Sequence, residues 1–151
     1  TPVVTDQPAG TVNIYNWLPF TQQDLTSAAA VATRFGVDYD SFTYTENTAA
    51  YLAKMNGLIN SGLKTLLQNA YATPGTAQLR TSQQQVATAT ASIESLRAFG
   101  QSSLTFIVSI TQRLASSQGT SSSDTPYAVT VTNTGGSWQV SDVELASLGN
   151  S

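Results

Sequence analysis

The chain has 151 residues, which is enough for one domain with its own hydrophobic core. It contains no cysteine and no histidine, which excludes disulfide bonds and removes the side chain most used for acid–base catalysis and metal binding. Only 10% of the residues are charged, the net charge is −3, and the six basic residues are scattered. This distribution argues against nucleic-acid binding, which needs a basic cluster.

The N-terminal part of the chain predicts a linker rather than a folded element. Proline and glycine interrupt regular structure over residues 1–10, and the apolar residues after them are expected to fold back as a brace. No apolar run approaches the roughly 20 residues needed to span a bilayer. We therefore expect a linker and brace over residues 1–20 and one domain over residues 21–151.

A capping box predicts the start of the first helix. Thr21 supplies the hydroxyl, Asp24 supplies the carboxylate three residues later, and Phe20 before them can act as a hydrophobic staple. Apolar residues then recur at spacings of three and four, which predicts a long amphipathic helix. This stripe consists of Leu25, Ala28, Ala29, Ala32, Phe35, Tyr39 and Phe42.

Two further helices are predicted before the pattern changes. Asn47 or Thr48 caps the second helix, which Gly57 ends, and Ser61 caps the third. The buried side of the third helix is expected to hold Leu63, Leu66, Leu67, Ala70 and Tyr71. Residues 73–75, with the sequence Thr-Pro-Gly, are expected to close the helical half.

From there the apolar period becomes two, which is typical of strands. The predicted strands are residues 85–94, 104–114, 127–132 and 138–143. A polar, mobile loop is expected over 116–124, a hairpin turn over 133–136, and a phase shift near Ser141 or Asp142. Helices followed by a strand meander indicate an α+β domain, with three N-terminal helices packed on a curved antiparallel sheet of about four strands.

The chemical motifs are weak. Ser61 and Lys64 match the S-x-x-K spacing of penicillin-binding enzymes, but the companion motifs are absent and helix capping explains both residues. Asp38 and Asp40 are expected to be exposed acids at a helix end rather than metal ligands. Seven aromatic residues could line a pocket, but core filling is the favoured interpretation. They are Phe35, Tyr39, Phe42, Tyr44, Phe106, Tyr127 and Trp138.

Three segments carry a resemblance to a known superfamily. They are the helical run 25–35, the two helices after it, and the ending 127–145, in which Gly135-Gly136 precede Trp138-x-Val140. Over about residues 21–148 this order of elements resembles the nuclear transport factor two-like superfamily. The resemblance implies a cone of helices on a curved sheet.

Two groups within that superfamily are similar. The stretch from Phe35 through Tyr39-x-x-Phe42-x-Tyr44 resembles the TcpC-like and VirB-eight-like proteins of Gram-positive conjugation, a branch of type IV secretion. The second group is the Mce-associated proteins of actinobacteria, which are accessory to lipid transport. Both resemblances imply a non-catalytic scaffold domain on the extracytoplasmic face, anchored by a membrane helix outside this chain. Its partners would be other cell-envelope proteins and further copies of itself, for example in a trimer, with no direct contact to nucleic acid.

Two alternatives remain open. The superfamily also contains small-molecule binders and enzymes, such as ketosteroid isomerase-like and polyketide cyclase-like members, which place an acid and sometimes a tyrosine inside the cone. Here the acids fall at caps, helix ends, loops and strand edges, so we expect no enzyme, no catalytic or metal-binding residue and no cofactor. A secreted adhesion module is the third interpretation.

Overall fold

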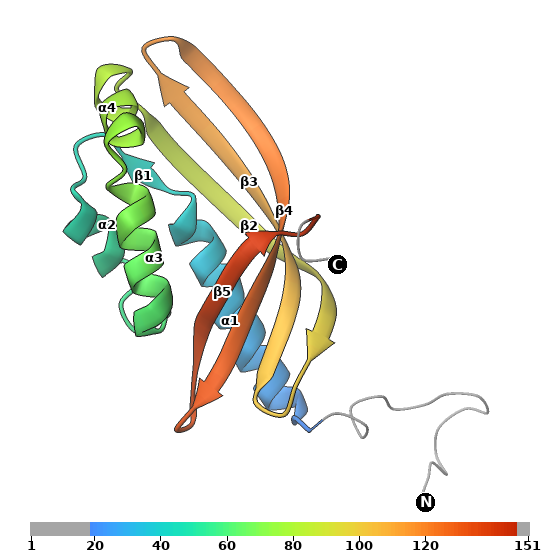
Figure 1. Ribbon diagram of the computed structural model, residues 1–151. Helices are drawn as coiled ribbons and strands as arrows, with labels where there is room; N and C mark the ends of the chain where they lie inside the picture. Colours follow the sequence, from blue (N-terminus) through green and yellow to red (C-terminus); the bar gives the residue numbers. More distant parts are fainter. Residues whose placement is uncertain (1–18, 148–151) are drawn as a thin grey trace, which may run out of the picture.

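The computed structural model describes residues 19–147 (Figure 1). Almost all of the expected linker and brace lies outside these residues. The described elements are α1 (Gln22–Tyr39), β1 (Phe42–Thr43), α2 (Thr48–Ala53), α3 (Ser61–Tyr71), α4 (Pro74–Ser82), β2 (Val86–Phe99), β3 (Ser103–Ser116), β4 (Gly119–Thr134) and β5 (Ser137–Leu145).

The strands form one antiparallel meander in the order β1-β2-β3-β4-β5, and the helices cover one face of it (Figure 1). The predicted α+β class and curved antiparallel sheet are confirmed. The sheet has five strands instead of about four, because Phe42 and Thr43 pair with Ala87 and Val86. Phe42 was expected on the first helix, but α1 ends at Tyr39 and the chain turns to the sheet edge.

The predicted capping box of α1 is present. The backbone N–H of Asp24 donates to Thr21 Oγ1 and that of Thr21 donates to Asp24 Oδ2, both at 3.0 Å. Phe20, the expected staple, is buried with its ring centroid 5.6 Å from that of Trp138. The start of α1 is therefore tied to β5.

The caps of α2 and α3 are both asparagines. Asn47 caps α2 as predicted, its Oδ1 accepting from the N–H of Ala50 at 2.8 Å. Asn60, not Ser61, caps α3, and its Oδ1 accepts from the N–H of Leu63 at 2.9 Å. The N–H of Asn60 also donates to the Val140 carbonyl, so β5 fixes Asn60 in the extended conformation that a cap needs.

The buried stripe of α3 is narrower than predicted. Leu63, Leu67 and Tyr71 are buried, whereas Leu66 is 63% exposed and Ala70 is also exposed. These three buried residues are four positions apart, so α3 contacts the core along a single narrow line.

A fourth helix starts where the helical half was expected to close. Pro74 begins α4, a position where its missing N–H removes no helical hydrogen bond. The helix runs to Ser82, and Gln84 then turns into β2 with φ of 52°.

The polar segment 116–124 is not a loop. Ser116 pairs with Gly119, and the ladder of β3 and β4 continues without interruption from this turn to the core. Hydrogen-bonded backbone pairing needs no apolar side chains, so this part of the hairpin shows no alternating apolar pattern. Its tip lies beside the end of α4, where the N–H of Ser117 donates to the Gln83 carbonyl (Figure 1).

The last hairpin is as predicted. Gly135 and Gly136 take φ of 62° and 90° in a two-residue turn between Thr134 and Ser137. The register shifts beside Ser141, which confirms the predicted change of phase. The core lies between α1 and the concave face of the sheet; its fully buried large side chains are Phe35, Met55, Leu104, Val108, Ile110, Val129, Val131 and Val140.

Candidate interaction surface

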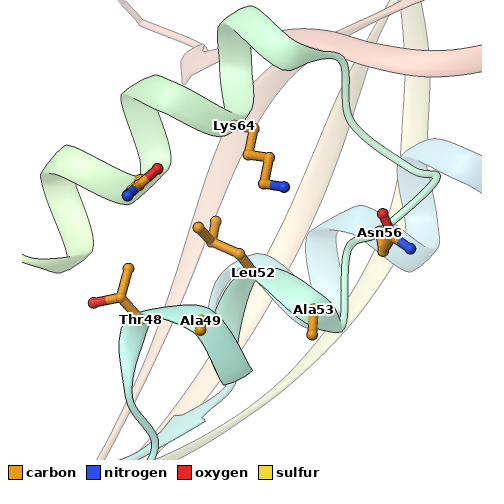
Figure 2. Close-up of a pocket in the computed structure, with 7 residues that line it drawn as sticks. Thr48, Ala49, Leu52, Ala53, Asn56 and Lys64 are labelled. Atoms are coloured by element: carbon orange, nitrogen blue, oxygen red, sulfur yellow. The ribbon is translucent and has the colours of Figure 1, made fainter.

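The S-x-x-K residues do not form a catalytic pair. Ser61 is exposed in the first turn of α3, and no hydrogen bond joins its Oγ to Lys64 Nζ in the described structure. Lys64 instead reaches into the space between α2 and α3 (Figure 2).

Most acidic residues occupy structural or exposed positions. Asp24 belongs to the α1 capping box, Glu46 pairs with Lys54 at 3.3 Å, and the exposed Asp124 accepts from Thr111 Oγ1. Three further acids on the strands are exposed: Glu94, Asp142 and Glu144.

Asp38 and Asp40 correct the expectation of exposed helix-end acids. Both are partly buried, and burial raises the pKa of each carboxyl; for Asp40 the pKa rises from 3.8 to about 6. The chain turns back toward β2 immediately after α1, which brings Asp40 under the neighbouring β3, where Gln112 Nε2 donates to the Asp40 carbonyl at 3.0 Å.

At the centre of the cone the aromatic side chains fill the core, while Tyr44 and Trp138 also line surface pockets. Phe35 is fully buried and stacks on Tyr39 at 5.2 Å, and Tyr39 meets the Tyr127 ring edge-on at 5.6 Å. Phe106 and Trp138 are buried, while Phe42 and Tyr44 are partly buried near the sheet edge. At the centre of the cone, the aromatic side chains therefore occupy the core, which is the interpretation favoured from the sequence.

A second aromatic group, which the sequence did not reveal, joins the helices to one another. The Tyr51 and Tyr71 rings stack at 4.1 Å, and the Tyr51 hydroxyl donates to the Tyr39 carbonyl at 2.6 Å. Arg80 on α4 covers the other side of Tyr71, with Cζ 3.6 Å from the ring centroid. The helical spacing in the sequence predicts that Tyr71 is buried. It does not predict α4, and therefore it could not place Arg80 next to Tyr71.

A groove of about 620 Å³ lies between α2 and α3 (Figure 2). We call it the α2–α3 groove; it is lined by Thr48, Ala49, Leu52, Ala53, Asn56, Lys64 and Gln68. Leu52 gives it an apolar floor, the alanines keep it open, and Lys64 is its single charged residue. Such a surface suits a partner that combines apolar and acidic groups.

Neither a cluster of potential metal ligands nor a membrane-spanning helix is found among residues 19–147. Between residues 19 and 147, no three carboxylates come together in a way that could hold a metal ion. Within the same range, no helix combines the length and apolarity needed to cross a membrane.

No protein-family model and no curated protein matches the sequence. Solved structures do match. An IcmL-like type IV secretion system protein from Legionella pneumophila superimposes with a TM-score of 0.63 at 12% identity, over 80% of this chain and 91% of that one. The periplasmic domain of DotI gives 0.64 at 9% identity, over 84% and 96%, and a periplasmic fragment of TraM gives 0.57 at 8%, over 79% and 94%.

This chain shares its fold with these three solved structures. The likeness covers nearly the whole of each solved domain, so the shared unit is the complete helix-on-sheet cone and not a local motif. The likeness concerns the fold alone, and it confirms the expected cone of helices packed on a curved antiparallel sheet.

Proposed function

We propose that this chain is a non-catalytic assembly domain, on the extracytoplasmic face of the membrane, in a component of a type IV secretion complex such as a conjugative transfer system. The observation that carries the proposal is the whole-domain likeness to three solved structures described as type IV secretion or periplasmic domains. The domain would span residues 21–151, with a membrane anchor supplied outside this chain. It would bind other envelope components and further copies of itself.

Its lack of catalytic function is supported by the placement of the reactive groups. Ser61 and Lys64 do not interact, and most acids serve caps, ion pairs or exposed positions. Under this proposal the protein acts by binding partners through its surface, and the α2–α3 groove is the candidate contact site. Its occupant would be an apolar segment of another subunit that carries an acidic residue to meet Lys64.

The location can be tested with a single cysteine, because these 151 residues contain none. Ser122 is exposed on β4, so Ser122→Cys should react with a membrane-impermeant maleimide in intact cells or spheroplasts. The full-length protein without the substitution is the control. Labelling that requires cell lysis would contradict the extracytoplasmic assignment.

The assembly role can be tested by transfer. Deleting the gene should abolish conjugative transfer or secretion in the host system, and the wild-type gene should restore it. Ala53→Trp fills the α2–α3 groove and should lower transfer at least about tenfold, whereas Ala50→Trp, on an exposed position of the same helix, should not.

Two results of that experiment would count against us. Normal transfer in the deletion strain would refute the secretion role itself. Equal transfer by the two tryptophan variants, with both folded by circular dichroism, would remove the groove as the contact.

One observation favours the alternative of a small-molecule-binding or enzymatic cone. Asp40 is a partly buried carboxyl with a pKa near 6, next to the Tyr39 and Tyr127 side chains. The variant Asp40→Asn tests this alternative in the same deletion strain. If the domain acts only in assembly, the variant should restore transfer as fully as the wild-type gene does. Loss of transfer by a well-folded Asp40→Asn protein would favour the alternative.

A further inference from the structure

Arg80 is an unusual arginine. It lies on α4 and is only 8% exposed, with its guanidinium resting on the Tyr71 ring and 5.8 Å from the centroid of the Phe42 ring. Its Nη2 donates to the Tyr71 carbonyl at 2.7 Å, at the C-terminal end of α3. These contacts hold the guanidinium in one place.

The charge of Arg80 has no acidic partner among residues 19–147. The ion pair found there joins Lys54 to Glu46 instead. Buried arginines are normally paired, because removing an unpaired charge from water costs free energy. A guanidinium also has five N–H donors, and the structure gives Arg80 one hydrogen bond.

The remaining donors are not sealed inside the protein. Among the described residues, Arg97 Nη1 is the buried side-chain nitrogen or oxygen that lacks a hydrogen bond, so the free N–H groups of Arg80 reach solvent. Arg80 is one of the residues that line a cavity of about 310 Å³, which we call the Arg80 pocket. Its other lining residues come from the loop between β1 and α2, the start of α2, the end of α3, and α4 itself.

The lining of this pocket provides further polar groups. Thr45, Asn47 and Thr48 come from the β1–α2 loop and the start of α2, and Thr81 comes from α4. Glu46 also lines it, but its Oε1 is 3.3 Å from Lys54 Nζ, which offsets its charge. Thr81 Oγ1 already donates to the Ala77 carbonyl and Thr45 Oγ1 shares a hydrogen bond with Thr43 Oγ1, so the fixed cation of Arg80 is the group that suits a small oxygen anion.

We propose that the Arg80 pocket binds a carboxylate group. A carboxylate matches the planar donor fork of a guanidinium and carries the single charge that one arginine offsets. A phosphate dianion would bring a second charge close to Glu46, for which the lining offers no cation besides Arg80. This site goes beyond the proposed assembly function and does not depend on it.

Two sources can supply the carboxylate, and small probes separate them. N-acetylglutamate α-amide presents a side-chain carboxylate, N-acetylalanine presents a chain-terminal one, and N-acetylglutamine α-amide is the neutral control. In an NMR titration, at least one acid should shift the amides of Thr45, Thr48 and Thr81 with saturation. The neutral probe should leave them unchanged. The acid that binds more tightly identifies the source.

Variants test the role of the guanidinium. Arg80→Gln should weaken carboxylate binding at least about tenfold, while Arg113→Gln, which removes an exposed arginine of β3, should leave it unchanged. Since Arg80 also packs on Tyr71, its loss could unfold the protein. Ala77→Leu, which keeps the guanidinium but fills the pocket, should then weaken binding about fivefold or more by exclusion.

Three results would overturn the proposal: no saturable shift with either acid, equal binding by wild type and folded Arg80→Gln, or tighter binding of inorganic phosphate than of both carboxylates. Unchanged binding by Ala77→Leu would also overturn it, because the pocket would then not be the site.

Discussion

At the scale of single residues, position in the fold changes the chemistry of Asp40. The residue follows the last turn of α1, and burial there raises the pKa of its carboxyl to about 6. Between about pH 4 and pH 6 the folded protein therefore holds a proton that the unfolded chain releases. The free energy of unfolding must fall as the pH rises through that window, and the loss is complete above it.

Asp40→Asn should remove this dependence. A shift from 3.8 to about 6 corresponds to at most about 3 kcal/mol, and solvent screening of a partly exposed group should reduce it to about 1 kcal/mol. We expect the variant to be more stable than wild type at pH 7 and equal to it near pH 4, measured by urea unfolding. Asp142→Asn, at an exposed position of β5, is the control. Parallel pH profiles of wild type and Asp40→Asn would contradict the assignment.

The cap of α3 gives a second prediction at this scale. Asn60→Ala should lower the free energy of unfolding by about 1 kcal/mol, because the N–H of Leu63 loses its acceptor. Ser61→Ala should cost less than about 0.5 kcal/mol. Chemical denaturation distinguishes the two, and a larger loss for Ser61→Ala would restore the cap expected from the sequence.

At the scale of elements, α1 lies unusually close to the sheet. Gly36 is buried in α1, and a Cβ added there would lie 2.9 Å from Ala91 Cβ on β2 and 3.3 Å from Ile110 Cδ1 on β3. Ala91 Cβ is fixed to the backbone and cannot move aside. Small residues at both positions therefore set the distance between helix and sheet.

Gly36→Ala should for this reason destabilise the protein. The gain in helix propensity of about 1 kcal/mol is outweighed by overpacking of about 1–3 kcal/mol. Adding Ala91→Gly should recover at least about 1 kcal/mol relative to the sum of the single variants, in a thermal or urea double-mutant cycle. An increase in stability with Gly36→Ala alone would show that α1 shifts at little cost.

The missed elements share one physical cause. Both α4 and the outer part of the β3–β4 hairpin carry few buried side chains, so neither shows a period of 3.6 or 2 in its apolar residues. The hairpin persists through its backbone ladder, and α4 through contacts such as the stacking of Arg80 on Tyr71. The apolar period of a sequence reveals only elements that bury one face. Elements stabilised by backbone hydrogen bonds or by single side-chain contacts are not predicted from it.

At the scale of the whole molecule, the cone presents two different kinds of surface. The α2–α3 groove has an apolar floor with polar residues and one cation around it, whereas the Arg80 pocket is polar around a buried cation. Both are built where helices meet, while the sheet supplies the rigid support beneath. Under the proposed assembly role, both features would place partner contacts on the helical layer.

The sequence by itself determined the α+β class, the capping box of α1, the glycine turn between β4 and β5, and the alternation that places Leu104, Val108 and Ile110 in the core. These features depend on neighbours within a few residues or on a period in the chain. Only the tertiary structure decided that Asn60 caps α3, that Asp40 is partly buried, and that Arg80 lines a pocket without forming an ion pair to a described residue. Asn60 depends on β5, Asp40 on β3, and Arg80 on the β1–α2 loop, all of which are distant from these residues in sequence. A local sequence pattern does not specify which distant segment packs against it.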